Sequence, residues 1–173
     1  MPTPIRDLQA SSGQAKSVAM SDAITLDLAD EAATRRLGAR LAALARPGDV
    51  LALAGDLGGG KTTLARAFVR ALMGEDEEVP SPTFTLVQTY EAPAATIWHF
   101  DLYRLERPED VFELAFEEAL TDGICLIEWP QRLGGLLPAG RLDVALSPGA
   151  VAEARRAVLT SHRQWDDRIG ELA

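Results

Sequence analysis

Five segments of the chain carry the hydrophobic pattern of β-strands. Residues 50–54 and 123–128 are short apolar runs, which are typical of central strands buried on both faces of a sheet. Residues 24–28 alternate between apolar and polar side chains, as a strand with one buried face does. Residues 85–90 and 96–103 also have strand patterns, and the link between them is so short that we expect an antiparallel pair.

Helical patterns separate these strands. A first helix is expected between Asp30, a suitable N-cap, and Pro47, where a Pro-Gly pair ends it. A second helix follows a glycine-rich loop and ends near Met73. A third is expected from Pro108 to about Leu120, with acidic residues in its first turn that favour the helix dipole.

The order of these elements predicts one α/β domain. Residues 141–146 and 154–160 form a second expected hairpin, and a short amphipathic helix should begin at His162. The result is a mixed parallel and antiparallel central sheet with helices on both faces. We expect a single domain over residues 21–173, preceded by a flexible tail over residues 1–20 that is rich in Pro, Ser, Gln and Ala and lacks periodicity.

Composition and charge narrow the function. The 173 residues carry a formal net charge of −9, whereas a stand-alone nucleic-acid-binding protein normally needs a basic face. Any nucleic-acid role would therefore require a partner. The single cysteine, Cys125, cannot form an internal disulfide, which indicates a reducing cytoplasm. No apolar run approaches the ~20 residues of a membrane span, and the N-terminus lacks a secretory pattern, so we expect a cytoplasmic protein with no membrane contact.

The strongest chemical signal is a phosphate-binding loop. Gly55-Asp56-Leu57-Gly58-Gly59-Gly60-Lys61-Thr62 fits G-x-x-x-x-G-K-[ST], between an apolar strand and a helix. Loop amides and the helix dipole would face the phosphates of ATP, Lys61 would reach the β and γ oxygens, and the Thr62 hydroxyl would ligate Mg²⁺. The predicted nucleotide-binding residues here are Gly55, Asp56, Gly58, Gly59, Gly60, Lys61, Thr62 and Thr63. A chance match is disfavoured by the flanking elements, and we expect a P-loop NTPase-like three-layer sandwich.

Two carboxylates end predicted strands and are candidates for hydrolysis. Glu128 follows residues 124–127 in the place of a Walker B acid, where it can hold Mg²⁺ or polarise the attacking water. Asp101 ends a similar run, and it can support the metal or the water. The alternatives are a solvated acid at a strand exit for Glu128 and a pair with Arg104 for Asp101. Which carboxylate touches the metal stays open.

Four other residues need a choice between chemistry and structure. Thr83 lies between prolines and a phenylalanine and resembles a switch threonine that senses the γ-phosphate, although its hydroxyl could equally cap a turn. His99 lies inside a strand, where a packed histidine is more common than a catalytic one. Cys125 has apolar neighbours and is expected to be a core residue. Trp129 could stack on a ligand or simply pack.

Four motifs in order resemble one protein family, the bacterial TsaE (YjeE) ATPases. The motifs are Gly55-Asp56-Leu57-Gly58-Gly59-Gly60-Lys61-Thr62-Thr63, Ser81-Pro82-Thr83-Phe84-Thr85-Leu86-Val87, His99-Phe100-Asp101-Leu102-Tyr103-Arg104 and Ile124-Cys125-Leu126-Ile127-Glu128-Trp129-Pro130. The likeness covers about residues 22–165, and four ordered motifs are far more specific than the phosphate loop alone.

The resemblance implies a role in tRNA modification. Members of the family are small cytoplasmic ATPases needed to form N6-threonylcarbamoyladenosine at position 37 (t6A37) of tRNAs that read codons starting with A. They act with a TsaB–TsaD heterodimer, so tRNA would be met indirectly, through the complex. TsaD transfers the threonylcarbamoyl group, and ATP hydrolysis by TsaE is thought to reset the complex.

The resemblance also implies roles for single residues. Thr62 and Glu128 would ligate Mg²⁺, with Asp101 supporting the metal or the water and Thr83 belonging to the switch. Glu31, at the start of the first helix, matches the family's segment beside the adenine.

Other P-loop functions have weaker support. A small-molecule kinase usually needs an Arg-rich lid, whereas here Arg132 stands alone and Arg155 and Arg156 lie in a predicted strand. The family likeness also brings Arg155 toward the nucleotide. A switch GTPase would use an N-K-x-D segment, and the chain contains no asparagine. An assembly protein with incidental hydrolysis is a third possibility. We expect a slow ATP hydrolase that partners stimulate, because no arginine finger is evident in the chain.

Overall fold

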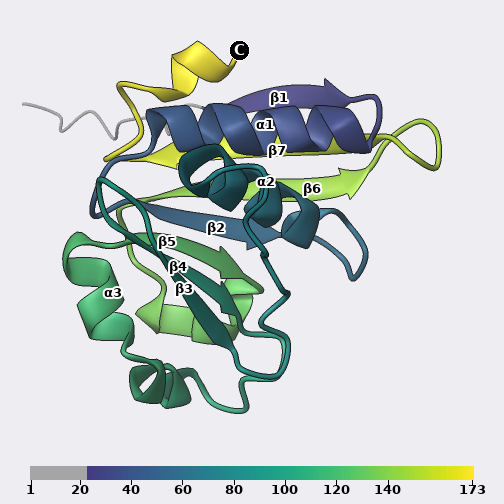
Figure 1. Ribbon diagram of the computed structural model, residues 1–173. Helices are drawn as coiled ribbons and strands as arrows, with labels where there is room; N and C mark the ends of the chain where they lie inside the picture. The colour runs from purple at the N-terminus through teal and green to yellow at the C-terminus, as the bar shows by residue number, and fades with distance from the viewer. Residues whose placement is uncertain (1–22) are drawn as a thin grey trace, which may run out of the picture.

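A seven-stranded mixed sheet forms the centre of the protein. The computed structural model describes residues 23–173, so the tail expected for residues 1–20 lies outside the described part of the chain. The strand order is β1-β7-β6-β2-β5-β4-β3 (Figure 1). The strands are β1 (Ala23–Leu28), β2 (Val50–Ala54), β3 (Val87–Glu91), β4 (Thr96–Asp101), β5 (Ile124–Glu128), β6 (Arg141–Pro148) and β7 (Arg155–His162). Strand β2 pairs parallel with β5 and β6, and β5 with β4, whereas β1–β7, β6–β7 and β3–β4 are antiparallel. The expected mixed sheet and antiparallel pair are confirmed.

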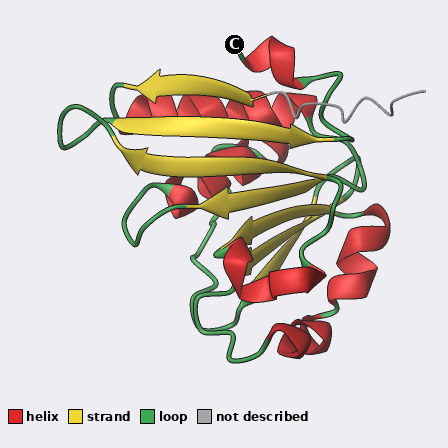
Figure 2. Cartoon of the chain, turned by 180° about the vertical axis from the view of Figure 1, so that it is seen from behind, coloured by secondary structure: helices red, strands yellow, loops and turns green. Residues whose placement is uncertain are grey.

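Helices lie on both faces of this sheet, as expected. Helices α1 (Glu31–Leu44) and α2 (Lys61–Met73) pack side by side on one face (Figure 1). The 3-10 helix η1 (Pro108–Leu114), helix α3 (Phe116–Asp122) and the 3-10 helix η2 (Pro130–Leu136) cover the other face next to β2, β5 and β4. In the described part of the chain that second face stays without a helix over β1, β7 and β6 (Figure 2). No helix within residues 23–173 has the length and apolar character needed to cross a membrane.

The alternation of side chains places the polar residues of β4 and β5 on the α2 face. On β5, Leu126 packs in the core shared with α1 and α2, so Glu128, two residues later, points to the same face. On β4, Ile97 belongs to that core, and His99 and Asp101 follow it at intervals of two. Strands β4 and β5 therefore place three polar side chains, His99, Asp101 and Glu128, on the face of the sheet that α2 covers.

The expected helix from Pro108 to Leu120 is not continuous. Ala115 adopts a left-handed conformation with φ of 57° and separates η1 from α3. Val111 and Phe116 are both buried in the core on the second face of the sheet. On an uninterrupted helix, residues five apart point about 140° away from each other, so the break allows both side chains to reach the same core.

The helix expected from His162 is also wrong. Strand β7 continues to His162, which is opposite Arg141 of β6. Their side chains share one acceptor there, because the Asp143 carboxylate accepts from Arg141 Nε at 2.6 Å and lies 2.9 Å from His162 Nε2. Turns follow, and the 3-10 helix η3 (Ile169–Leu172) ends the chain.

Several strand boundaries differ from the expected ranges. Strands β6 and β7 end at Pro148 and His162, two residues beyond the ends expected for them. The strand predicted over 85–90 begins at Val87, because Leu86 has a φ of 66° that does not fit a strand. The strand predicted over 96–103 ends at Asp101, where a turn begins.

Candidate active site

The phosphate-binding loop connects β2 to α2 at the carboxyl end of the parallel strands. Helix α2 begins at Lys61, directly after Gly60, whose φ is 102°, and Gly58 has a φ of 73°. These left-handed conformations favour glycine and turn the loop back over the helix N-terminus. The first amides of α2 lack partners within the helix, so they are available to an anion.

Lys61 lies at the base of this loop. Its ammonium donates hydrogen bonds to the Gly55 carbonyl at 2.7 Å and to the Asp56 carbonyl at 2.8 Å. The same ammonium lies 4.2 Å from the centre of the Trp129 ring. Gly55 and Asp56 thus hold the lysine with their backbone oxygens, rather than lining the pocket themselves.

The electrostatic environment of Lys61 has two opposing effects. Burial lowers the pKa of its ammonium, because removing the charged group from water disfavours it. The carboxylates of Glu128, Asp101 and Asp56 raise the pKa and partly offset this effect. Three acidic groups around one ammonium give the site an excess of negative charge, which a bound divalent cation would offset.

A pocket of about 630 Å³ opens beside the loop. Its lining includes seven of the predicted nucleotide-binding residues: Glu31, Gly58, Gly59, Gly60, Lys61, Thr62 and Thr63. The pocket is completed by Asp30, Ala32 and Thr34 around the start of α1, by Ala152 and Glu153 of the β6–β7 turn, and by Arg155 at the start of β7. Arg155 Nη2 lies 3.4 Å from the Gly58 carbonyl, so the guanidinium reaches the phosphate loop.

Glu128 connects the loop to the strands behind it. The Thr62 hydroxyl donates to Glu128 Oε2 at 3.0 Å. The other carboxylate oxygen, Oε1, lies 2.8 Å from His99 Nε2. Glu128 is only 2% exposed and His99 is 0% exposed, so the contact between these two side chains is closed to bulk water.

Asp101 accepts a hydrogen bond from the loop that contains Thr83. The Thr83 hydroxyl donates to Asp101 Oδ2 over a long 3.4 Å and lies 2.8 Å from the Ser81 hydroxyl. The amide of Tyr103 donates to Asp101 Oδ1 at 3.1 Å. Arg104, which could have paired with Asp101, stacks its guanidinium over the Phe84 ring at 4.6 Å instead.

The oxygen atoms at this site suit Mg²⁺. Within residues 23–173, no group of three or more His, Cys, Asp or Glu side chains is arranged to hold a metal ion by itself. Magnesium, however, is usually bound through one or two protein oxygens, together with phosphates and water. The adjacent Thr62 hydroxyl and Glu128 carboxylate, with Asp101 nearby, are hard oxygen donors of this kind.

Comparison with known proteins decides the family. The model of the family described as "Threonylcarbamoyl adenosine biosynthesis protein TsaE" matches residues 28–157, a segment that contains every site residue named above. The chain belongs to the TsaE family. The resemblance found from the four motifs is therefore confirmed.

Individual relatives agree with this assignment. The tRNA threonylcarbamoyladenosine biosynthesis protein TsaE of Rickettsia conorii is 40% identical over 137 residues, which are 79% of this chain and 78% of the relative. The protein of the same name from Bacillus subtilis is 39% identical over 114 residues, 65% of this chain and 70% of the relative. The crystal structure of Bacillus subtilis YdiB superposes with a TM-score of 0.73 at 28% identity, and the match covers 88% of this chain and 95% of YdiB. The P-loop NTPase-like fold is thus the fold of this TsaE protein.

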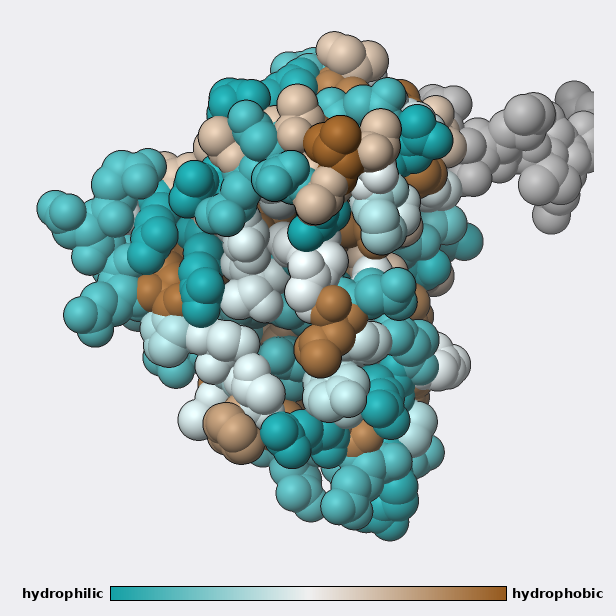
Figure 3. Space-filling view, turned by 90° about the vertical axis from the view of Figure 1, so that its right-hand side faces the viewer, coloured by the Kyte–Doolittle hydropathy of each residue, from teal (hydrophilic) through white to brown (hydrophobic). Residues whose placement is uncertain are grey.

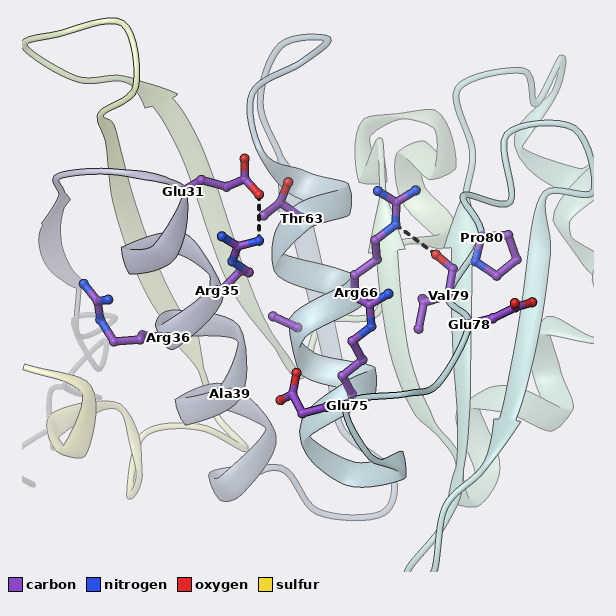
Figure 4. A pocket seen from close by; sticks show the side chains of 12 residues that line it. Glu31, Arg35, Arg36, Ala39, Thr63, Arg66, Glu75, Glu78, Val79 and Pro80 are labelled. Carbon is purple, nitrogen blue, oxygen red and sulfur yellow. Dashed lines mark hydrogen bonds and ion pairs between the residues drawn. The ribbon is translucent and has the colours of Figure 1, made fainter.

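A second groove of about 670 Å³ lies on the other side of Glu31 and Thr63 in this TsaE protein (Figure 4). It is lined by four arginines, Arg35, Arg36, Arg66 and Arg70, and by three glutamates, Glu31, Glu75 and Glu78. Arg35 pairs with Glu31 at 3.0 Å, and Arg66 Nε donates to the Val79 carbonyl at 2.9 Å. Because the charges nearly balance, the groove is not a basic patch of the kind that binds nucleic acid.

Two contacts of the site were not foreseen from the sequence. His99 was expected to be a packed residue, but it contacts Glu128. The signal was its spacing of two from Asp101, which places both on one face of β4. Trp129, for which stacking and packing were equally expected, contacts both the Lys61 ammonium and the Tyr103 ring, whose centre is 4.9 Å away.

Proposed function

We propose that this TsaE protein is a Mg²⁺-dependent ATPase that supports formation of t6A37 in tRNA. The observation that carries the proposal is the contact between the Thr62 hydroxyl and the Glu128 carboxylate at the base of the phosphate loop. This contact joins a phosphate-binding element to the acid needed for hydrolysis. A role in tRNA modification would place this activity in the cytoplasm.

Binding of ATP would use the loop and the start of α2. Loop amides and the helix dipole would bind the phosphates, and the Lys61 ammonium would reach the β and γ oxygens from the base of the loop. Glu31 and Thr63 line the same pocket and would contact the rest of the nucleotide. Arg155 would close the pocket from the side of the β6–β7 turn.

Hydrolysis would be in-line attack of water on the γ-phosphate. Bound Mg²⁺, held by Thr62 and Glu128, would neutralise charge that develops on the phosphate oxygens. Lys61 and the loop amides would stabilise the same charge. Glu128 or Asp101 would orient the attacking water, and Thr83 would couple its loop to the γ-phosphate.

Two exposed apolar side chains support a role for partner proteins. Leu57 of the phosphate loop is 78% exposed, and Phe84, next to Thr83, is 81% exposed. Figure 3 shows the side of the molecule at the right of Figure 1, where separate apolar groups lie among polar ones. We propose that TsaB–TsaD docks over the loops of the site and that tRNA contacts the other subunits, since this chain has a net charge of −9.

The first experiment measures ATP hydrolysis with the Lys61→Ala variant. We expect the release of phosphate to fall at least about 100-fold, which is the effect of removing one preorganised group from a charged transition state. Ser161→Ala is the matched control, because Ser161 is buried in β7 and contacts Asp166 instead of the site. Normal turnover by Lys61→Ala would overturn the proposal.

Two additions distinguish the proposal from its rivals. Adding TsaB–TsaD should raise the turnover of ATP. The complex should also retain tRNA, whereas this protein alone should not. Failure of the pair to bind or to stimulate turnover would favour a nucleotide-binding assembly protein. Incubation with small metabolites should yield only ADP and phosphate, whereas a phosphorylated metabolite would show a kinase.

A further inference from the structure

We infer that His99 is a positioning residue that fixes the carboxylate of Glu128 for ATP hydrolysis. This inference rests on the proposed ATPase activity and adds a residue to it. Its basis is the contact of 2.8 Å between His99 Nε2 and Glu128 Oε1, made across the neighbouring parallel strands β4 and β5.

The chemistry of the two groups fixes the direction of this hydrogen bond. An ionised carboxylate has no proton to donate, so Nε2 of His99 carries the proton and donates it to Glu128. The other ring nitrogen, Nδ1, is buried and has no hydrogen-bond partner among the described residues. The bond to Glu128 is therefore the one polar contact that holds the imidazole in the described part of the chain.

The contact leaves Glu128 with a single useful orientation. With Oε1 bound to His99, Oε2 faces the Thr62 hydroxyl at 3.0 Å and the pocket beyond it. The terminal torsion of a glutamate is broad and roughly two-fold, so a carboxylate without such a partner rotates easily. His99 removes this freedom before ATP and Mg²⁺ bind.

His99 cannot act on the nucleotide directly. Its side chain is 0% exposed, and it does not line the nucleotide pocket. Packing alone is the competing explanation, because Ile97 precedes it in the same core. Packing, however, does not account for a polar ring whose only hydrogen-bond partner within residues 23–173 is the acid of the site, since burying such a ring costs free energy that an apolar side chain would not.

The test compares two polar substitutions of similar size. In His99→Gln the amide nitrogen reaches the place of Nε2 and can donate to Glu128. In His99→Asn the amide nitrogen reaches only the place of Nδ1, away from Glu128. We expect His99→Asn to lower kcat by about 10- to 100-fold, the usual effect of losing a partner behind a metal ligand, and His99→Gln to stay within about 5-fold of the wild type. The KM for ATP in the presence of Mg²⁺ should rise by about the same factor as the Mg²⁺-dependent affinity falls, because ATP dissociates faster than a slow ATPase hydrolyses it. The affinity for ATP without Mg²⁺ should stay unchanged, because the phosphate loop is intact.

Nucleotide binding gives a readout that does not depend on turnover. Calorimetry with a non-hydrolysable ATP analogue, with and without Mg²⁺, measures how much the ion tightens binding. His99→Asn should reduce this tightening about 10-fold, and His99→Gln should restore most of it. Ser161→Ala, a buried polar residue remote from the site, should leave both kcat and the Mg²⁺ effect unchanged.

A double-mutant cycle separates positioning from a general structural effect. On a Glu128→Ala background, His99→Asn should change the affinity for the ATP analogue in the presence of Mg²⁺ by less than about 2-fold, because the group it positions is gone. Equal losses on both backgrounds, or equal losses in the Asn and Gln variants, would overturn the inference. Wild-type kcat and Mg²⁺ effect in His99→Asn would also overturn it. If the wild-type protein itself neither binds nor hydrolyses ATP, with or without TsaB–TsaD, the proposed function fails instead.

Discussion

Asp101 and Glu128 are register partners at the ends of the adjacent parallel strands β4 and β5, and their carboxylates contact different parts of the site. Glu128 accepts from the Thr62 hydroxyl of α2, whereas Asp101 accepts from the Thr83 hydroxyl and the Tyr103 amide. Glu128 thus contacts the helix that follows the phosphate loop, and Asp101 contacts the segment expected to act as a switch. Two adjacent carboxylates with separate partners can divide metal binding and switching between them.

Glu128→Gln and Asp101→Asn should therefore differ in effect. We expect Glu128→Gln to lower kcat about 100-fold and to abolish the tightening of nucleotide binding by Mg²⁺, because it removes the charge next to Thr62. Asp101→Asn should lower kcat about 10-fold and keep most of the Mg²⁺ effect. Steady-state kinetics and calorimetry with an ATP analogue measure both. Loss of the Mg²⁺ effect in Asp101→Asn alone would reverse the two assignments.

Thr83→Ala tests whether this loop senses the γ-phosphate. If it does, the variant should bind ADP with the affinity of the wild type but bind an ATP analogue about 10-fold more weakly. The reason is that the lost hydroxyl would interact only with the γ-phosphate, which ADP lacks. Thr83→Ser keeps the hydroxyl and should resemble the wild type. Equal affinities of Thr83→Ala for both nucleotides would leave the hydroxyl as a turn cap, bonded to Ser81 at 2.8 Å.

The parts of the site that are local in sequence could be predicted, and the parts that depend on register could not. The phosphate loop, with Lys61 and Thr62, is one continuous segment whose flanking strand and helix carry clear hydrophobic patterns. The contact of His99 with Glu128 joins residues 29 positions apart, and it exists because β4 and β5 pair in one particular register. Nothing in either segment alone specifies that register.

The fold followed the same rule. The sequence predicted all seven strands, since each has its own periodicity, whereas the helix expected over 108–120 breaks at Ala115. The break allows both Val111 and Phe116 to be buried in a core that distant strands form. The helical periodicity of the segment does not reveal that requirement. Beyond His162, too, tertiary contacts determine the path of the chain, because Trp165 is fully buried.

Gly38 of α1 marks a close approach of the two helices, and Gly38→Ala should destabilise the protein. A Cβ atom there would meet the Leu64 carbonyl of α2 at 2.5 Å and Ala67 Cβ at 3.0 Å. Overpacking of this kind costs about 1–3 kcal/mol, which exceeds the gain of about 1 kcal/mol in helix propensity. Urea denaturation measures the free energy of unfolding. Gly135→Ala is the control, because its Cβ would meet nothing within 4 Å, and a loss as large as that of Gly38→Ala would refute the steric argument.

Cys125 should be unreactive in the folded protein at neutral and mildly alkaline pH. Burial raises the pKa of its thiol to about 12, because the thiolate would be a charge in an apolar core. At pH 8 the reactive thiolate is then only ~10⁻⁴ of the total, against roughly a quarter for an exposed cysteine. A colorimetric disulfide reagent should label the thiol slowly in buffer and rapidly in denaturing urea. Rapid labelling in buffer would show that the core around β5 opens readily.

Arg168→Met should be strongly destabilising, although residue 168 lies outside the segment matched by the family model. Arg168 forms two hydrogen bonds with the Asp49 carboxylate, at 2.7 Å and 2.9 Å, and both residues are only 3% exposed. Its guanidinium also donates to the carbonyl of Leu44 at the end of α1, so it links the C-terminal segment to the start of β2. The methionine would leave the Asp49 carboxylate buried with the Arg46 amide as its remaining donor, at 2.7 Å.

Removing one partner of such a pair costs about 3–5 kcal/mol, because the other charge stays buried without compensation. Urea denaturation should show this loss for Arg168→Met. The double variant Asp49→Leu with Arg168→Met removes both charges and should be more stable than Arg168→Met alone, since no unpaired carboxylate remains. The opposite result would be a double variant whose loss of unfolding free energy equals the sum of the losses in Asp49→Leu and Arg168→Met. That result would show that the two substitutions act independently and that an unpaired buried carboxylate does not explain the loss in Arg168→Met. ATP affinity of the folded protein should be unchanged in both, because neither residue lines the nucleotide pocket.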